Sequence, residues 1–194
     1  MGEQKRRALA ELLPRYLWVA GADAWPAGDV VMEIGFGMGD ATAQMAAASP
    51  RRTWIAVDIH TPGIAHLSRV LDTEGIGNVR ICVDDALDVL TSHVPQSSLV
   101  AIHVFFPDPW PKARHHIRRL VQQPFLDLAA NALAPRGVLH VATDWDDYAQ
   151  QMQEAIGAHP AFRGTDPPPR PVTKYERTGL AAGRSITDIA AERQ

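Results

Sequence analysis

The stretch Val30–Met45, VVMEIGFGMGDATAQM, decides the fold of this chain. Its first residues are apolar and β-forming, and they run into Glu33. Three glycines follow at alternate positions: Gly35, Gly37 and Gly39. A helix-like run then covers Ala41–Ala48. A strand, a glycine turn and a helix in this order are the first unit of a doubly wound α/β sheet, in which a ligand lies at the carboxyl end of the strand.

Two acidic residues flank the glycine turn, Glu33 just before it and Asp40 just after it. Carboxylates at these places would repel the pyrophosphate of a dinucleotide, which normally lies on a helix N-terminus. They suit a cationic ligand. S-adenosylmethionine carries a sulfonium and an ammonium and has no phosphate, so the turn favours it over NAD, although a purely structural glycine turn is an alternative.

The rest of the chain alternates between strand-like and helix-like segments. Five strands are expected, at Val30–Ile34, Thr53–Ile59, Asn78–Val83, Ser98–Val104 and Gly137–Ala142. Helices are expected over 3–17, 61–75, 86–90, 117–133 with a kink at Pro124, and from Thr143-Asp144 to about 157. Alternation at βαβ spacing predicts a mainly parallel sheet. Beyond Pro160 the pattern is lost, and 186–191 fits a strand or a short helix.

Length and composition set the class of protein. A chain of 194 residues, 46% apolar, is long enough for one domain with a real core. One cysteine, Cys82, excludes an intrachain disulfide, and no apolar run is long enough to span a bilayer, so we expect a cytoplasmic protein. The net charge is −3, so an RNA site would have to be a local basic patch. The eight histidines show no zinc spacing, and no metal is expected.

Two further acids end strands on the rim where a ligand is expected. Asp58 ends the second strand, about twenty residues after the glycine turn, where an acid binds ribose hydroxyls in nucleotide-binding sheets. Asp85 ends the third strand and suits the exocyclic amine of adenine. Asp84 is the alternative for that role, and a further alternative for either acid is the N-cap of the next helix.

The loop after the fourth strand, HVFFPDPWPKARHHIRR, is the most specific feature. Asp108 lies between two prolines, which restrict the backbone, and it is flanked by Phe105, Phe106 and Trp110. Cationic residues follow: Lys112, Arg114, His115, Arg118 and Arg119. A fixed carboxylate, aromatic faces and a run of cations are what a flipped guanine in RNA needs. The alternative is a rigid proline loop followed by a solvated basic helix. Asp144, after the fifth strand, by itself indicates only a helix cap.

Six segments in this order resemble the bacterial tRNA (guanine-N7)-methyltransferases, the TrmB type. They are EIGFGMG at 33–39, VDIHTPG at 57–63, DDALDVL at 84–90, FFPDPWPKARHHIRR at 105–119, ATDWDDYA at 142–149 and RPVTKYERTG at 170–179. The resemblance implies a Rossmann-like class I methyltransferase with a seven-stranded, mainly parallel sheet and helices on both faces. It implies S-adenosylmethionine as donor and N7 of guanine 46, in the variable region of tRNA, as acceptor.

The resemblance also implies roles for individual residues. The cofactor-binding set would be Glu33, Gly35, Gly37, Gly39, Asp58, Asp85 and Asp108. Asp108 would be the catalytic-site acid and would touch both ligands. Lys112 and Asp144 would contact the guanine nucleotide, and a C-terminal segment would close over it with Thr173, Lys174, Tyr175 and Glu176. The RNA backbone would be held by Arg114, His115, Arg118 and Arg119.

The expected organisation is a single domain, with an N-terminal helix and loop at 1–28, a cofactor-binding core at 29–160 and a substrate-closing segment at 161–194. The chain begins about where the first helix of the family begins, without the family's usual basic arm. Leu180 and Thr187 stand where the family usually has histidine and tryptophan. Competing hypotheses are a methyltransferase acting on another nitrogen in RNA, DNA or protein, a tRNA-binding protein with little turnover, and an NAD enzyme.

Overall fold

The structure is a computed structural model that describes residues 2–194. The chain divides into two compact units, one ending at Pro95 and the other comprising Gln96–Gln194. Each unit contains both helices and strands, with β1–β3 in the first unit and β4–β7 in the second.

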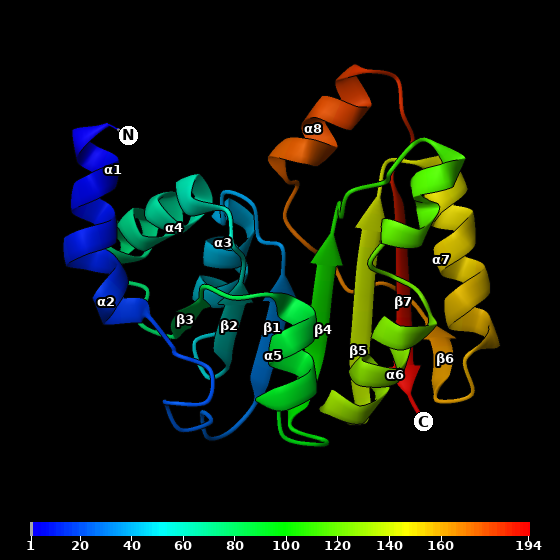
Figure 1. Ribbon diagram of the computed structural model, residues 1–194, viewed down its shortest axis with the longest axis horizontal. Helices are drawn as coiled ribbons and strands as arrows, with labels where there is room; N and C mark the ends of the chain where they lie inside the picture. The colour runs from blue at the N-terminus through cyan, green and yellow to red at the C-terminus, as the bar shows by residue number, and fades with distance from the viewer. Residues whose placement is uncertain (1) are drawn as a thin grey trace. The chain divides into compact units, whose positions relative to one another are not determined.

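The first unit begins with a continuous helical segment and continues with three strands and three helices. Its elements are α1 Glu3–Arg7, the π-helical turn η1 Ala8–Leu12, α2 Leu13–Tyr16, β1 Val30–Ile34, α3 Asp40–Ala48, β2 Thr53–Val57, α4 Thr61–Glu74, β3 Val79–Cys82 and α5 Ala86–Ser92. The strands are parallel in the order β3-β2-β1 (Figure 1).

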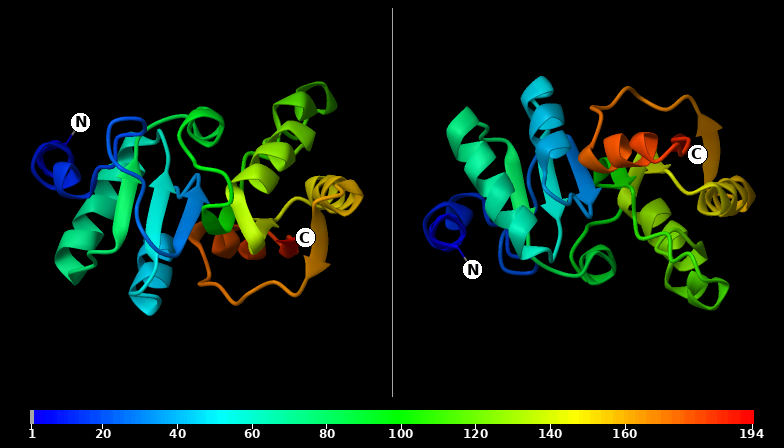
Figure 2. Two further views of the ribbon diagram at one scale, coloured as in Figure 1. Left: turned by 90° about the horizontal axis from the view of Figure 1, so that it is seen from below. Right: turned by 90° about the horizontal axis from the view of Figure 1, so that it is seen from above.

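Helices cover both faces of these three strands. Viewed along the strands, α3 and α4 lie on one face and α5 on the other (Figure 2). Every residue of β1 is buried, and α4 turns Ile64, Leu67 and Leu71 into the core. A fully buried aliphatic side chain of this size contributes about 1.5–3 kcal/mol. Burial on both faces explains why the residues of β1 other than Glu33 are all apolar.

The N-terminal segment is fixed to the edge of the sheet through Leu17 and Trp18. The Trp18 amide donates to the carbonyl of Ile81 at 2.9 Å, and Leu17 forms an isolated parallel bridge with the same residue. The Trp18 side chain is buried, and its indole N–H donates to the carbonyl of Ala24. The first helix is therefore anchored beside β3.

The second unit contains four strands and the remaining helices. Its elements are β4 Leu99–Phe105, the 3₁₀ helix η2 Ala113–Arg118, α6 Gln123–Ala132, β5 Leu133–Thr143, α7 Asp146–Ala158, β6 Phe162–Thr165, α8 Lys174–Ala181 and β7 Thr187–Arg193. β4 and β5 are parallel, and β7 is antiparallel to both β5 and β6. Both η2 and α8 lie beyond the carboxyl ends of β4 and β5 (Figure 1).

The predicted helix over 117–133 is wrong in its first part. α6 begins only at Gln123, and Pro124 is in its first turn, where its missing amide costs no hydrogen bond. Pro124 therefore starts the helix and does not kink it. Three elements after residue 160 had no predicted structure or an open one: β6, α8 and β7. β7 forms with Thr187 as its first residue, paired with Thr143.

The predicted fold class is confirmed. The described residues contain seven strands with parallel neighbours β3-β2-β1 and β4-β5 and helices on both faces of the first set. The boundaries proposed for a single domain stay a prediction. No helix within residues 2–194 has the length and apolar character needed to cross a membrane.

Candidate functional site

The glycine turn between β1 and α3 has a left-handed backbone at all three predicted glycines. Their φ angles are +72° at Gly35, +59° at Gly37 and +81° at Gly39. At Gly39 two features exclude a side chain: the positive φ angle, and a Cβ that would come within 2.9 Å of Leu67. The turn therefore needs glycine for its backbone and, at Gly39, for its packing on α4.

Asp58 holds this turn in place from the end of β2. Its Oδ2 accepts the amide of Gly37 at 2.9 Å, and its Oδ1 accepts the amide of His60 at 2.8 Å. One carboxylate thus joins the glycine turn to the chain that enters α4. Each carboxylate oxygen has a second lone pair, so the arrangement is compatible with the predicted ribose role.

Glu33 is a buried acid at the end of β1. Only 3% of the residue is exposed, and its Oε2 has no hydrogen-bond partner among the described residues. The pKa of Glu33 is raised to about 7, mainly because burial disfavours the charged form. The hydroxyl of Thr42 lowers this pKa, and the charge of Asp58 raises it further. A buried carboxylate with an unused oxygen is costly unless a donor or cation reaches it.

We expect Glu33→Gln to remove a pH dependence of stability. Because the pKa of Glu33 is about 7 in the folded protein and near 4.5 when unfolded, the folded state binds more protons between these values. Wild-type stability should therefore fall, relative to the variant, as pH rises from about 4.5 to 7, and stay constant above. Over this pH range the free energy of unfolding of the wild type should fall by about 3 kcal/mol relative to that of the variant. Urea unfolding of both proteins at pH 5, 6, 7 and 8 measures the two free energies. Parallel plots of unfolding free energy against pH would contradict the prediction.

Of the two neighbouring acids Asp84 and Asp85, the structure shows which one caps the next helix. Asp85 caps α5, because its Oδ1 accepts the amides of Leu87 at 2.8 Å and Asp88 at 3.3 Å. The Oδ1 of Asp84 accepts the amide of Asp85 at 2.8 Å. Both acids are exposed. Since the cap uses only Oδ1, the second oxygen of Asp85 lies outside it, and the adenine role stays a prediction.

Gly63 belongs to the site and was missed from the sequence. It lies in the first turn of α4, and a Cβ there would be 1.6 Å from the carbonyl oxygen of Gly37. The start of α4 therefore packs directly on the backbone of the glycine turn. A glycine inside the first turn of a helix, directly after Thr61-Pro62, is the sequence signal that could have revealed it.

The loop after β4 presents Asp108 from an unusual backbone. Phe106 and Trp110, on either side of Pro107-Asp108-Pro109, have φ angles of +55° and +46°. Left-handed backbone at bulky residues costs on the order of 1–3 kcal/mol each and persists only where neighbours enforce it. The Phe106 amide donates to the carbonyl of Ala142 in β5 at 2.7 Å. The Asp108 side chain itself is exposed.

Arg170 supports the aromatic side of this loop. Its guanidinium lies 5.2 Å from the ring centre of Phe105 and 5.4 Å from that of Phe106. It also binds both carboxylate oxygens of Asp188, at 2.6 and 2.8 Å, and reaches Glu176. Burial raises the pKa of Asp188, but hydrogen bonds from His140 and Arg170 outweigh it and lower the value to about 2.

The C-terminal helix α8 packs on Asp144. Arg184 donates from Nε to the Oδ2 of Asp144 at 2.7 Å, and a Cβ at Gly179 would come within 2.7 Å of the same oxygen. The predicted cap role of Asp144 is wrong, because Trp145 occupies the N-cap position of α7. Asp108 and Asp144 follow adjacent parallel strands, since Phe105 pairs with Ala142.

The predicted segment Thr173–Glu176 forms the start of α8. The Thr173 side chain accepts the amide of Glu176 at 3.0 Å, and the Glu176 carboxylate pairs with Arg170. Lys174 and Tyr175 are exposed. The sequence T-x-x-E is the signature of a capping box, and this signal could have predicted α8.

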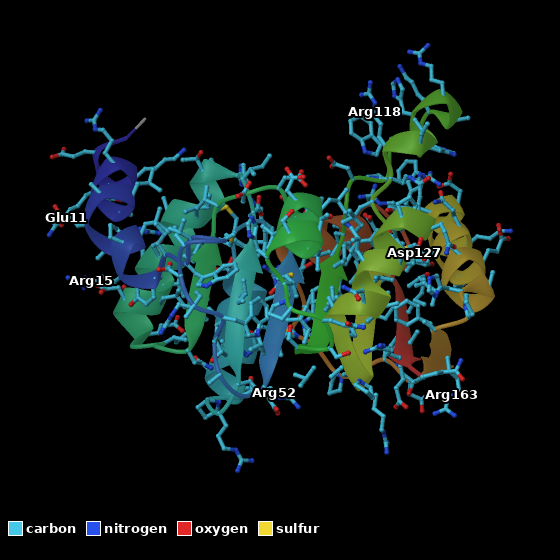
Figure 3. All side chains as sticks on the ribbon, turned by 60° about the horizontal axis from the view of Figure 1, so that its bottom comes forward. Glu11, Arg15, Arg52, Arg118, Asp127 and Arg163 are labelled. Atoms are coloured by element: carbon cyan, nitrogen blue, oxygen red, sulfur yellow. The ribbon has the colours of Figure 1, made fainter. Side chains whose placement is uncertain are left out.

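The predicted RNA-backbone residues separate into two groups. Arg114 and Arg118 are exposed and His115 is partly exposed. Lys112, predicted to contact the guanine nucleotide, is exposed beside them. Figure 3 shows Arg118 projecting from η2, and its guanidinium lies 4.9 Å from the ring centre of Trp110. Arg119 is only 3% exposed and faces protein groups, so its position does not fit the predicted contact with the RNA backbone.

Within residues 2–194, no three His, Cys, Asp or Glu side chains gather as a metal site.

Comparison with known proteins identifies the family. Residues 27–189 match the family model described as "Putative methyltransferase". A tRNA (guanine-N(7)-)-methyltransferase of Halorhodospira halophila is 45% identical over 82% of this chain and 72% of its own length. That of Thiobacillus denitrificans is 41% identical over 100% of this chain and 91% of its own length. The chain belongs to the tRNA (guanine-N(7)-)-methyltransferase family.

Solved structures agree on the fold. The 16S rRNA (adenine(1408)-N(1))-methyltransferase of Catenulisporales acidiphilia, solved as a variant with its cosubstrate SAM, superposes with a TM-score of 0.57 at 13% identity. The match covers 86% of each chain. At this identity the likeness concerns the fold alone. It agrees with the class I architecture predicted from the resemblance to the tRNA (guanine-N(7)-)-methyltransferase family.

Proposed function

We propose that this protein transfers a methyl group from S-adenosylmethionine to N7 of guanine 46 in the variable region of tRNA. The family membership supports tRNA guanine-N7 methylation. The observation that carries the proposal within the structure is Asp108, an exposed carboxylate held between two left-handed residues beside aromatic rings and exposed cations. A strained loop of this kind is typical of a functional site.

The first unit fits the cofactor. Glu33 offers a buried oxygen that has no hydrogen-bond partner within residues 2–194, and this oxygen suits the ammonium of the methionine moiety. The glycine turn admits a ligand against its backbone, and Asp58 and Asp85 offer acceptors for ribose hydroxyls and the adenine amine. When bound, S-adenosylmethionine supplies an electrophilic methyl group. Retention of the acids therefore favours this donor over a phosphate-bearing cofactor.

The second unit fits the guanine. Asp108 and Asp144 follow neighbouring strands and offer acceptors to the N1–H and amino groups of a guanine. Arg184 already occupies one oxygen of Asp144, so guanine would share this carboxylate or displace the arginine. Lys112, Arg114, His115 and Arg118 supply positive charge beside the loop for the phosphates.

Acid–base catalysis is not required by this reaction. Guanine N7 has a free lone pair at neutral pH, so no proton leaves before attack. N7 bonds to the methyl carbon as the carbon–sulfur bond breaks with its electrons to sulfur, and the positive charge passes to the guanine ring. Orientation of N7 supplies much of the acceleration. Asp108 would orient the ring and stabilise the charge that develops on it.

The test is transfer from methyl-labelled S-adenosylmethionine to unmodified tRNA, followed by nucleoside analysis. We expect 7-methylguanosine, and no label in a matched transcript in which adenine replaces guanine 46. Label in a different nucleoside, or in the matched transcript, would refute the assigned position. Cofactor binding without any transfer would favour a tRNA-binding protein with little turnover.

A further inference from the structure

Arg119 lies in the basic run after the loop of Asp108, but it faces the interior of the second unit. Its side chain is 1% exposed, compared with exposed neighbours such as Arg118. A guanidinium can be buried only where hydrogen-bond acceptors and an opposite charge compensate the lost water. The partners of Arg119 therefore show what the residue does.

All three nitrogens of the Arg119 guanidinium have protein partners. Nε donates to the carbonyl oxygen of Pro109 at 2.8 Å, and one terminal nitrogen donates to the side chain of Gln151 at 2.7 Å. The other terminal nitrogen pairs with Asp147 at 2.7 Å and lies 3.0 Å from His116 Nε2. The guanidinium also lies over the Tyr148 ring at 4.7 Å.

These contacts join one particular peptide to a rigid helix. Gln151, Asp147 and Tyr148 all belong to α7, whose inner face is buried. Pro109 directly follows Asp108, and its ring restricts both residues. The next residue, Trp110, has the left-handed backbone that needs external support. Arg119 therefore connects the loop that carries Asp108 to the core of the second unit.

We propose that Arg119 is a positioning residue for Asp108 and does not bind RNA. This inference rests on the proposed function and names a residue that sets the geometry of the same site. Loss of the Pro109 contact would let the loop relax and displace the carboxylate. A displacement of about 1 Å at a reacting group can lower a rate by roughly 100-fold.

Arg119→Ala and Arg119→Lys test the proposal in the full-length protein with tRNA. We expect kcat at saturating tRNA and cofactor to fall about 10- to 100-fold in the alanine variant. Lysine keeps the charge but not the fork of donors, so its loss should be smaller and intermediate. The Kd for tRNA, measured by filter binding, should stay within about twofold of wild type in both, because a buried arginine contributes no released counterion.

Two matched variants separate positioning from other roles. Tyr148→Phe removes the hydroxyl that accepts the amide of Val121 at 3.0 Å but keeps the ring beneath Arg119, so it perturbs the same helix and should keep wild-type kcat. Arg118→Ala should raise the Kd for tRNA and lower its salt dependence by about one unit of slope. Thermal unfolding of all variants reports any general destabilisation.

The outcomes are distinct. A raised Kd for tRNA with unchanged kcat in both Arg119 variants would overturn the proposal and would support the predicted contact of Arg119 with the RNA backbone. An equal loss of kcat in Tyr148→Phe would show a general packing effect and would also overturn it. If Arg119→Ala does not fold, the intermediate kcat and unchanged tRNA affinity of Arg119→Lys decide. A wild-type protein that forms no 7-methylguanosine would instead refute the proposed function.

Discussion

Asp108→Ala is expected to lower kcat for methyl transfer to tRNA by about 100- to 1,000-fold, the usual cost of removing one preorganised group that stabilises charge in a transition state. Positive charge moves onto the guanine ring as N7 is methylated, and the variant has no carboxylate to meet it. Since the Asp108 side chain is exposed, the melting temperature should change little. Single-turnover rates with saturating labelled cofactor and tRNA measure the effect.

Two controls define the role of Asp108. Asp108→Asn keeps the shape and one acceptor but loses the charge, so its kcat should lie between those of wild type and the alanine variant. Asp166→Ala removes another exposed acid, in the proline-rich stretch Asp166–Pro171 (DPPPRP), and should keep wild-type kcat. Wild-type kcat at saturating cofactor should be flat from about pH 6 to 8.5, because guanine N7 needs no base. A steep rise with a midpoint near neutrality would contradict a reaction in which no group has to remove a proton.

Gly63→Ala is expected to damage cofactor binding and stability together. The added Cβ would meet the carbonyl oxygen of Gly37 at 1.6 Å, and this obstacle is backbone that cannot rotate away. Either α4 or the glycine turn must move. Overpacking typically costs about 1–3 kcal/mol, and we expect the upper part of this range or more. For a chain of this size that corresponds to a melting temperature lower by roughly 6–12 °C.

The cofactor affinity of Gly63→Ala gives the sharper test. Asp58 bonds to both Gly37 and His60, so displacement of α4 also disturbs the predicted ribose acceptor. We expect the Kd for S-adenosylmethionine, measured by calorimetry, to rise at least about 100-fold, because the displacement of α4 would disturb several hydrogen bonds to the cofactor at once. Gly77→Ala is the matched control, because a Cβ there meets nothing within 4 Å. Equal behaviour of the two variants would contradict the packing argument.

The local sequence was sufficient for much of the fold. β1 and the helices α3 and α4 were predicted almost to the residue, because apolar runs, glycine punctuation and Thr-Pro helix starts are short-range signals. The region after Pro160 was not. β6 and β7 are antiparallel partners whose stability comes from pairing with each other and with β5, and such long-range pairing leaves little trace in the strand's own sequence.

What the sequence by itself determined is the type of chemistry: the acids beside the glycine turn, the rigid Pro-Asp-Pro loop and the family that these motifs resemble. Only the tertiary structure decided which polar side chains are exposed to solvent and which are held by other protein groups. Arg118 and Arg119 are adjacent and chemically identical, yet one projects into solvent and the other is buried against α7. Burial and partners are properties of packing between distant segments, so residue type and spacing alone could not separate a residue that reaches the substrate from one that positions the loop.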